Sequence, residues 1–299
     1  MPENASPEPV LIVGAVTWDV VGDERRAGGA ATFAARVATA LGVRAHVLVL
    51  AGPDAGLDAF LLHECAVVPV ARTLTLEHRF VEGERHQRVL VGPERALTPG
   101  DLPAGWPAAY RTIVLAPLLP DDIDVPAFLD ACAAGPTIEV ALLAQGLGRQ
   151  VAADGAITDR ASPSQVFFDV ARPNVTLFLS AEETAGWAPG DLDALVARSK
   201  RVVRTFGRDG AEIRTAAGVH AIEALPATLV DATGAGDVFA TALILAMRAG
   251  DDVAGRLAAA CAAACVERIG SAPLPARTEL ETRAGIAASD RSRAQGERT

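Results

Sequence analysis

The sequence predicts one doubly wound α/β domain, a mostly parallel sheet flanked by helices, with a small β-hairpin lid. Short β-branched runs alternate with helical segments along the chain, which is typical of parallel sheets. Two almost wholly apolar helices are expected near Val238–Ala249 and Val253–Glu267, and their composition requires burial. Two β-rich runs, Thr73–Val81 and His86–Val91, flank a polar turn and predict an exposed hairpin.

The first elements follow this alternation in order. A buried strand is expected at Val10–Gly14, a helix at Gly29–Leu41 and a second strand at Ala45–Leu50. Further strands are expected at Thr112–Ala116, Thr137–Leu143, Val175–Leu179 and Arg201–Thr205, and a second hairpin at Ala211–Ile222. Without a repeat or linker, residues 1–299 are expected to form a single domain, with lid elements near 15–27 and 73–91. The polar segment 282–299 is expected to be a disordered tail.

The charge of the chain excludes one large class of partners. A formal charge of −10 and a pI near 5.0 argue against nucleic-acid binding, which needs clustered basic side chains. No apolar run approaches the ~20 residues of a membrane helix, and the segment MPENASPEP lacks the pattern of a signal peptide. We therefore expect a cytoplasmic protein with no nucleic-acid partner and no membrane partner.

Lys200, the only lysine of the chain, excludes two common phosphate-binding motifs. A P-loop needs a lysine directly after a glycine, but Ser199 precedes Lys200. The strand motif of protein kinases does not surround it either. If phosphates are bound, backbone amides and arginines must therefore hold them. The four cysteines and five histidines show no metal-ligand spacing, so no metal cage is expected.

The segment Leu229–Ala240, LVDATGAGDVFA, carries the strongest chemical signal. A strand end leads into the turn formed by Gly234, Ala235 and Gly236, and a buried helix begins at about Asp237. Unpaired N–H groups and the positive end of the helix dipole make such a turn an anion site. A carboxylate inside it is typical of a general base that deprotonates a hydroxyl while the amides stabilise a phosphoryl group. Taken alone, the segment fits an ordinary helix-capping aspartate equally well.

The motif D-A-T-G-A-G-D resembles the D-T-x-G-A-G-D signature of the ribokinase-like (PfkB) carbohydrate kinases, and other segments match that family in order over roughly residues 10–280. The resemblance implies a ribokinase-like fold and transfer of the γ-phosphate of ATP to a hydroxyl group. Asp237 is then the catalytic base, and Gly234, Ala235 and Gly236 form the anion hole. The family also uses Mg²⁺ and in many members a monovalent cation, which suggests K⁺ here with Asp231 as a candidate ligand.

The other matching segments supply the binding candidates that the resemblance implies. Asp19 and the pair Gly28-Gly29 resemble the substrate-binding residues of the family. Glu183, in the segment SAEE, resembles the glutamate that organises magnesium and phosphate through water. The candidates for ATP binding are Thr205, Gly207, Gly210, Thr233, Gly234 and Gly236. Each candidate also has a simpler interpretation. Asp19 would be a solvated loop aspartate, Glu183 a carboxylate that favours a helix N-terminus, and Gly207 and Gly210 ordinary turn glycines.

Departures from the family pattern bear on the acceptor. Phe33 stands where ribokinase has an asparagine, and a phenyl ring cannot hydrogen-bond a sugar hydroxyl, so ribose is disfavoured. The compact pattern VGAVTWDVV followed by AGGAATF resembles myo-inositol-kinase-like members, which suggests a cyclitol or sugar. Gln145 and Arg149 resemble a segment near the substrate cleft of that subgroup. Only eight residues separate Asp19 from Gly28, so we expect residues 73–91 to supply most of the lid.

Three alternatives remain at this stage. A nucleoside kinase of the same fold would use Phe33 and Trp18 to stack a base, and a non-catalytic family member would keep the motifs without the activity. A dinucleotide-dependent oxidoreductase is disfavoured, because the third glycine of G-x-G-x-x-G would fall at Phe239. The expected partner is thus a small polyol, sugar or nucleoside. The exposed lid hairpin offers an edge through which a homodimer would pair.

Overall fold

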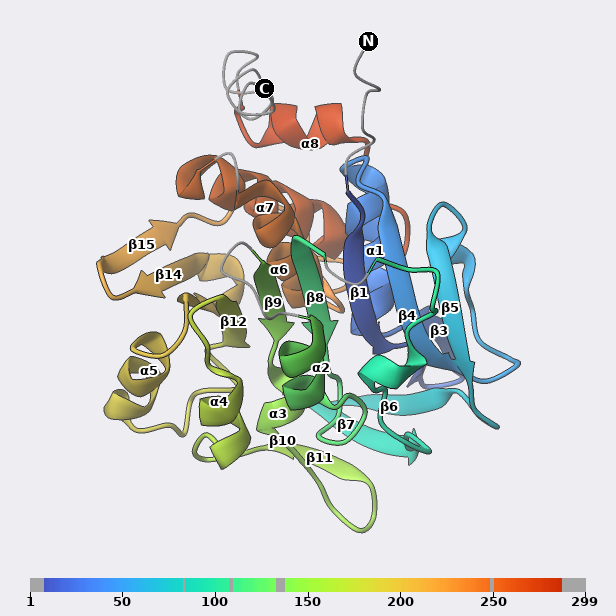
Figure 1. The fold of residues 1–299 in the computed structure, drawn as a ribbon. Coiled ribbons are helices and arrows are strands. Elements are labelled where there is room, and N and C mark those ends of the chain that lie inside the picture. The colour runs from blue at the N-terminus through green and yellow to red at the C-terminus, as the bar shows by residue number, and fades with distance from the viewer. Residues whose placement is uncertain (1–7, 83, 108–109, 133–137, 248–249, 287–299) are drawn as a thin grey trace.

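Two β-sheets organise the fold in a computed structural model that describes residues 8–82, 84–107, 110–132, 138–247 and 250–286 (Figure 1). The larger sheet has nine strands in the order β15-β14-β13-β12-β9-β8-β1-β4-β5. Its strands are β1 Val10–Ala15, β4 Ala45–Ala51, β5 Glu64–Pro69, β8 Thr112–Ala116, β9 Glu139–Leu143, β12 Val175–Ser180, β13 Arg201–Thr205, β14 Ala211–Thr215 and β15 Gly218–Ile222. Neighbours from β13 to β5 are parallel, and β14 and β15 form an antiparallel hairpin at one edge.

Helices cover both faces of this sheet, because successive side chains of its buried strands point to opposite sides. Ile12 belongs to an apolar cluster with α1, α6 and α7, whereas Leu11 belongs to a second cluster with α2, α4 and α5. The helices are α1 Ala30–Ala40, α2 Val125–Cys132, α3 Gln145–Gly148, α4 Gln165–Val170, α5 Pro189–Val196, α6 Ala235–Ala246, α7 Asp251–Val266 and α8 Arg277–Arg283. The predicted doubly wound α/β class is confirmed.

A second sheet of six strands, here called the lid sheet, lies across the carboxyl ends of the parallel strands (Figure 1). Its order is β10-β11-β7-β6-β2-β3. The strands are β2 Thr17–Val21, β3 Glu24–Gly28, β6 Leu74–Val81, β7 Glu84–Val91, β10 Arg149–Val151 and β11 Ala156–Asp159. The prediction of a small hairpin lid was therefore wrong in size. Residues 17–28 form a complete hairpin, and β10 and β11 extend the sheet beyond β7.

Two further expectations need correction. The lid hairpin β6–β7 was expected to offer a pairing edge, but β2 and β11 already occupy its two sides, so the edges of the lid sheet are β3 and β10. The tail was expected to be disordered from residue 282. The structure describes an ordered chain to residue 286, with Ala284 and Ile286 buried and Arg283 paired with Glu267. Residues 287–299 lie outside the described part. Within that part, none of the helices has the length and hydropathy to cross a membrane.

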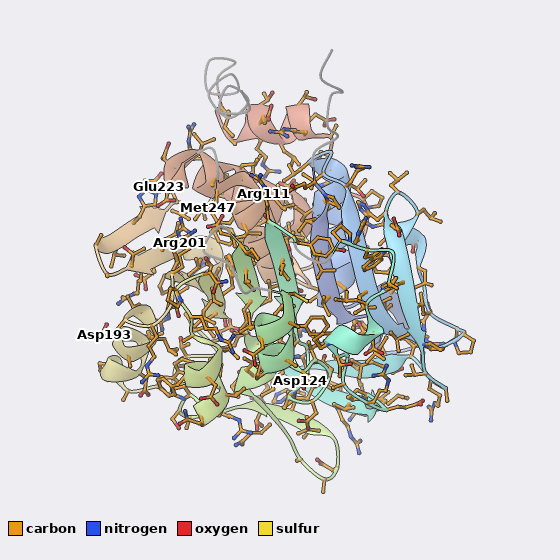
Figure 2. The ribbon with its side chains drawn as sticks, viewed as in Figure 1. Arg111, Asp124, Asp193, Arg201, Glu223 and Met247 are labelled. Carbon is orange, nitrogen blue, oxygen red and sulfur yellow. The ribbon has the colours of Figure 1, made fainter. Side chains whose placement is uncertain are left out.

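Lys200 lies at the end of the large sheet opposite the lid sheet. It precedes the first residue of β13, and its Nζ contacts Glu139 Oε1 at 2.5 Å. Arg201, labelled in Figure 2, donates to the same carboxylate oxygen at 2.9 Å. The single lysine thus belongs to an ion-pair cluster at the amino ends of the strands. At the carboxyl ends of the strands, arginines and backbone amides therefore remain as the groups that can bind phosphate.

Candidate active site

Most of the predicted site residues converge at the carboxyl ends of the parallel strands, where doubly wound sheets bind their ligands. Asp19 lies on β2, just after β1, and Gln145 begins α3 after β9. Glu183 follows β12, and Asp237 lies in the first turn of α6. Residues that are far apart in the sequence therefore lie at one edge of the large sheet, where the lid sheet adjoins it.

The turn before α6 is shaped by Gly234 and Phe33. Gly234 has φ of 77°, the left-handed region that favours glycine. A Cβ atom there would lie 2.3 Å from Phe33 Cε1, so the phenyl ring packs directly beneath the turn. Val238 is the first residue of α6 to donate to a carbonyl four residues back, that of Gly234. By helix geometry the preceding N–H groups of Gly236 and Asp237 have no partner within the helix, so they are available to bind an anion.

Asp237 has the electrostatics of a general base that works near neutral pH. Its Oδ1 accepts a hydrogen bond from Gln145 Nε2 at 3.2 Å. The pKa of Asp237 is raised to about 7, mainly by burial; the charges of Arg149 and Arg85 oppose the rise, and those of Glu183 and Asp19 add to it. A carboxylate with this pKa accepts a proton more readily than an ordinary aspartate. The structure thus places the predicted base beside the predicted anion hole.

Asp19 is held where the first strand enters the lid sheet. Thr17 Oγ1 donates to Asp19 Oδ1 at 2.9 Å, and the residue is only 9% exposed. A Cβ at Gly28 would lie 2.2 Å from Asp19 Oδ2, and one at Gly29 would lie 2.4 Å from the Ala15 carbonyl oxygen. Gly28 is therefore required for the chain to pass this carboxylate, and Gly29 for it to pass the backbone of Ala15.

Two arginines near Asp237 come from the lid sheet, Arg85 on β7 and Arg149 on β10. Burial lowers the pKa of Arg149, while the charges of Glu183 and Asp237 raise it. Its Nη1 donates to the Leu118 carbonyl oxygen and its Nη2 to Gln87 Oε1, both at 2.9 Å. Partial desolvation also lowers the pKa of Arg85, an exposed residue, against the charges of Asp19, Asp231 and Asp237 among others. Sequence reasoning singled out Arg149 but missed Arg85.

Glu183 is positioned by a reciprocal pair of bonds with Ser180. The Ser180 N–H donates to Glu183 Oε2 at 2.7 Å, and the Glu183 N–H donates to Ser180 Oγ at 3.0 Å. Burial raises the pKa of Glu183, and the bond from Ser180 and the charge of Arg149 lower it. Within the described residues no group of three or more His, Cys, Asp or Glu side chains would cage a metal ion. One or two carboxylates near a phosphate site do fit Mg²⁺, which keeps most of its waters.

The predicted nucleotide segment borders the same edge of the sheet. Thr205 ends β13, and its Oγ1 donates to the Leu179 carbonyl oxygen at 3.5 Å. Gly210 has φ of 94°, and a Cβ there would lie 2.2 Å from the Ile222 carbonyl oxygen, so the hairpin itself requires this glycine. Gly207, with φ of 57°, faces open space instead. Of the two glycines, Gly207 is the better candidate for a ligand contact.

Asp231 does not fit the monovalent cation suggested by the resemblance. The N–H groups of Thr233 and Gly270 donate to its two carboxylate oxygens, each at 2.9 Å, and Arg26 Nη1 lies 3.5 Å from Oδ2. Burial raises the pKa of Asp231, but these hydrogen bonds and the Arg26 charge hold it below its usual value. The carboxylate thus already has two donors and a cationic partner. We therefore assign no catalytic role to a monovalent cation at Asp231.

We expect the wild-type protein to melt at the same temperature in KCl and in NaCl of equal ionic strength. Arg26→Ala removes the positive charge from Asp231, so this variant should gain a K⁺-dependent rise in melting temperature. Differential scanning fluorimetry checks both results. Arg25→Ala is the matched control, because Arg25 pairs with Asp54 rather than Asp231. A rise in the wild-type melting temperature with K⁺ would show that a cation does bind there.

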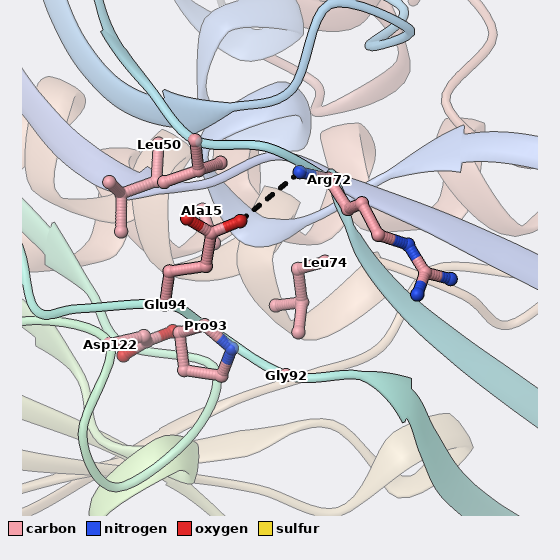
Figure 3. A pocket seen from close by; sticks show the side chains of 9 residues that line it. Ala15, Leu50, Arg72, Leu74, Gly92, Pro93, Glu94 and Asp122 are labelled. Carbon is pink, nitrogen blue, oxygen red and sulfur yellow. Dashed lines mark hydrogen bonds between the residues drawn. The ribbon is translucent and has the colours of Figure 1, made fainter.

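A small cavity between the large sheet and the lid sheet is lined by a buried carboxyl group. Asp122 lines it together with Leu74, Pro93 and Glu94 (Figure 3), and its volume of about 10 Å³ is that of roughly one water. Asp122 Oδ2 accepts from the N–H groups of residues 118 and 119, while Oδ1 has no partner within the described chain. Because the carbonyl of residue 118 accepts from Arg149, Asp122 supports the loop that holds this arginine.

Asp122→Asn should stabilise the protein at alkaline pH. Burial raises the pKa of Asp122 to about 7, above its unfolded value, so the folded state binds an extra proton and loses stability as pH rises from about 4 to 7. Asparagine keeps the accepting oxygen and removes this loss, on the order of 2–4 kcal/mol. Thermal melts at pH 8 should show a higher melting temperature for Asp122→Asn, with the difference shrinking by pH 5. Asp121→Asn, at an exposed neighbour, is the control, and an equal gain at both pH values contradicts the assignment.

The fold and this site match what a phosphotransferase acting on a hydroxyl group of a small molecule requires. Residues 168–277 match the family model described as pfkB family carbohydrate kinase. Three solved structures are similar along nearly their whole length. The first is a probable sugar kinase from Rhizobium etli CFN 42, with 18% identity and a TM-score of 0.74 over 94% of this chain and 99% of that one. The second is a pyrophosphate-dependent kinase in the ribokinase family complexed with a pyrophosphate analog and myo-inositol, with 16% identity and a TM-score of 0.69 over 92% of this chain and 99% of that one. The third is the Methanocaldococcus jannaschii nucleoside kinase, with 20% identity and a TM-score of 0.66 over 94% of this chain and 99% of that one.

The matched segment contains Asp237 and the glycine turn before it, and together with the ribokinase-like fold it supports the suspected PfkB family and the phosphotransferase class. No curated protein matches the chain. At these identities the solved structures establish the fold alone, so the acceptor, the donor and the roles of individual residues are matters for proposal.

Proposed function

We propose that this protein transfers the γ-phosphate of ATP to a hydroxyl group of a sugar or a cyclitol, with Asp237 as the general base. The observation that carries the proposal is the position of Asp237, next to the free N–H groups of the α6 turn and hydrogen-bonded to Gln145. A helix N-terminus alone would bind an anion. A carboxylate with a raised pKa inside that anion site supports proton abstraction from the hydroxyl that attacks the phosphoryl group.

The chain's own residues would act in three ways. Asp19 orients the acceptor by accepting a hydrogen bond from one of its hydroxyls, and Asp237 takes the proton of the attacking hydroxyl. The amides of the α6 turn stabilise the charge on the transferring phosphoryl group. The lid sheet, which lies across the carboxyl ends of the parallel strands, would limit the access of water to the site. When bound beside Glu183, Mg²⁺ would neutralise phosphate charge.

The aromatic side chains of the site support a polyol rather than a nucleoside. Phe33 is only 3% exposed and lies beneath Gly234. The Trp18 ring is covered by the guanidinium of Arg25, whose Cζ lies 4.2 Å from the ring centroid. The two residues that would have stacked a base are therefore engaged with the protein itself. This arrangement favours a sugar or cyclitol acceptor over a nucleoside.

A panel assay tests the proposal and its main alternatives together. Purified protein would be supplied with ATP or with pyrophosphate, because one similar structure is described as a pyrophosphate-dependent kinase. The acceptors would be myo-inositol, D-ribose and inosine, and new phosphate esters would be detected by mass spectrometry. Transfer from ATP to a sugar or cyclitol supports the proposal. Transfer only to inosine indicates a nucleoside kinase, transfer only from pyrophosphate changes the donor, and no transfer favours a non-catalytic member.

A further inference from the structure

His78 is a buried polar residue of the lid sheet that the proposed mechanism does not yet use. The parallel register of β2 and β6 pairs Val21 with His78, so Asp19 and His78 are diagonal neighbours on one face of the sheet. His78 is 5% exposed, and its Nε2 lies 3.4 Å from Asp19 Oδ1. Within the described chain this nitrogen makes no hydrogen bond. A buried imidazole nitrogen that makes no hydrogen bond therefore lies within ion-pair distance of the carboxylate proposed to hold the acceptor.

The other ring nitrogen determines where the proton of His78 lies. Arg85 Nε donates to His78 Nδ1 at 3.2 Å. Because a guanidinium group has donors and no acceptor, Nδ1 must be the accepting nitrogen, and the neutral ring carries its proton on Nε2. Gln87, the direct cross-strand neighbour of His78, has its Nε2 3.5 Å from the same Nδ1. The lid sheet thus presents an N–H donor next to a carboxylate acceptor.

We propose that His78 is an acceptor-binding residue, whose Nε2–H donates to an oxygen of the substrate adjacent to the hydroxyl held by Asp19. This inference rests on the proposed function and narrows its substrate class. A carboxylate and an N–H donor side by side match two neighbouring oxygens of a polyol, one donating to Asp19 and the other accepting from His78. Buried donors are rarely left unpaired in folded proteins, so an oxygen of a ligand is the natural partner. Vicinal diols, as in sugars and cyclitols, fit the pair, whereas isolated alcohols satisfy only one of its members.

The same histidine connects the acceptor to the transfer site. Arg85 is bonded to its Nδ1, and Gln87 accepts from Arg149, whose charge acts on Asp237. A substrate oxygen on Nε2 would fix the ring between Asp19 and Arg85. Occupation of the acceptor site would thereby hold both arginines of the cleft in place. Acceptor binding, rather than ATP binding, should depend on His78.

The decisive test compares binding of matched ligands to matched variants. Dissociation constants for myo-inositol, D-ribose and inosine, and for a monodeoxy derivative of each lacking one of the vicinal hydroxyls, would be measured by ligand-observed NMR on the full chain. The variants are His78→Leu, which removes the donor, and His78→Gln, which keeps an N–H near the Nε2 position. His86→Leu is the control, because His86 is exposed and alternation places it on the opposite face of the lid from Arg85 and Gln87.

We expect His78→Leu to weaken binding of the preferred polyol about tenfold, the loss typical of one hydrogen bond, with His78→Gln recovering part of it. The deoxy derivative that lacks the contacted oxygen should bind the wild-type protein about tenfold more weakly than the parent polyol does. It should bind His78→Leu no more weakly than the parent polyol binds that variant. An unchanged deoxy penalty in His78→Leu would mean that His78 is structural only. Absence of polyol binding to wild type would also overturn this inference. Binding without phosphate transfer would instead leave the inference intact and contradict the proposed kinase activity.

Discussion

Replacement of Asp237 by asparagine should lower kcat by a factor of about 10²–10⁴, the usual contribution of a general base. Asparagine has the same shape and retains the oxygen that accepts from Gln145 Nε2, but it cannot take the proton of the attacking hydroxyl. The KM for ATP should change little, because the donor is held by other groups. Steady-state kinetics with the acceptor found in the panel assay measure both values.

The pH profile gives this prediction a second readout. Burial raises the pKa of Asp237 to about 7, and only the deprotonated carboxylate is a base, so kcat/KM should rise with pH up to about 7 and then level off. The profile of Asp237→Asn should lack this rise. Asp193→Asn, on the exposed surface of α5 and labelled in Figure 2, should keep the wild-type rate and profile. Normal turnover by Asp237→Asn would assign the base to another residue.

The large sheet was predictable because its strands have a strong apolar signal. Five of them, β8, β9 and β13 with both strands of the β14–β15 hairpin, lie within the ranges expected from the sequence. The lid sheet lacked this signal. Strand β3, ERRAG, and strand β10, RQV, are polar and short, and they are held by pairing with neighbours rather than by apolar alternation. Strand pairing between distant segments is not visible in local sequence, so the size of the lid was missed.

The site residues likewise divide into those visible in the local sequence and those that only the fold brings together. The motif around Asp237 was predicted because the chemistry lies in one contiguous segment. The contact of Arg26 with Asp231 was invisible, because it joins opposite ends of the chain through the fold. His78 was missed for a different reason. Leu74 and Leu76 face inward on β6, and extending that alternation by two residues would have placed His78 on the buried face, so a signal was present.

The substitution Gly234→Ala should reduce both stability and activity. A new Cβ would lie 2.3–2.4 Å from three atoms of the Phe33 ring, and that ring, only 3% exposed, has no space to withdraw. The φ of 77° adds a backbone penalty of about 1–2 kcal/mol for a residue with a Cβ. With about 1–3 kcal/mol for overpacking, a loss of about 2–5 kcal/mol is expected in denaturant unfolding. The displaced turn would also move the amides that stabilise the phosphoryl group.

Two companion variants separate these causes. Gly236→Ala meets no atom within 4 Å and has no positive φ, so it should unfold like wild type, and any loss of its activity would report on the phosphate contact alone. The double variant Phe33→Leu/Gly234→Ala replaces the ring with a smaller side chain. It should recover the overpacking part of the stability while retaining the backbone penalty. Wild-type stability and kcat in Gly234→Ala would show that the anion hole does not depend on the packing of this turn against Phe33.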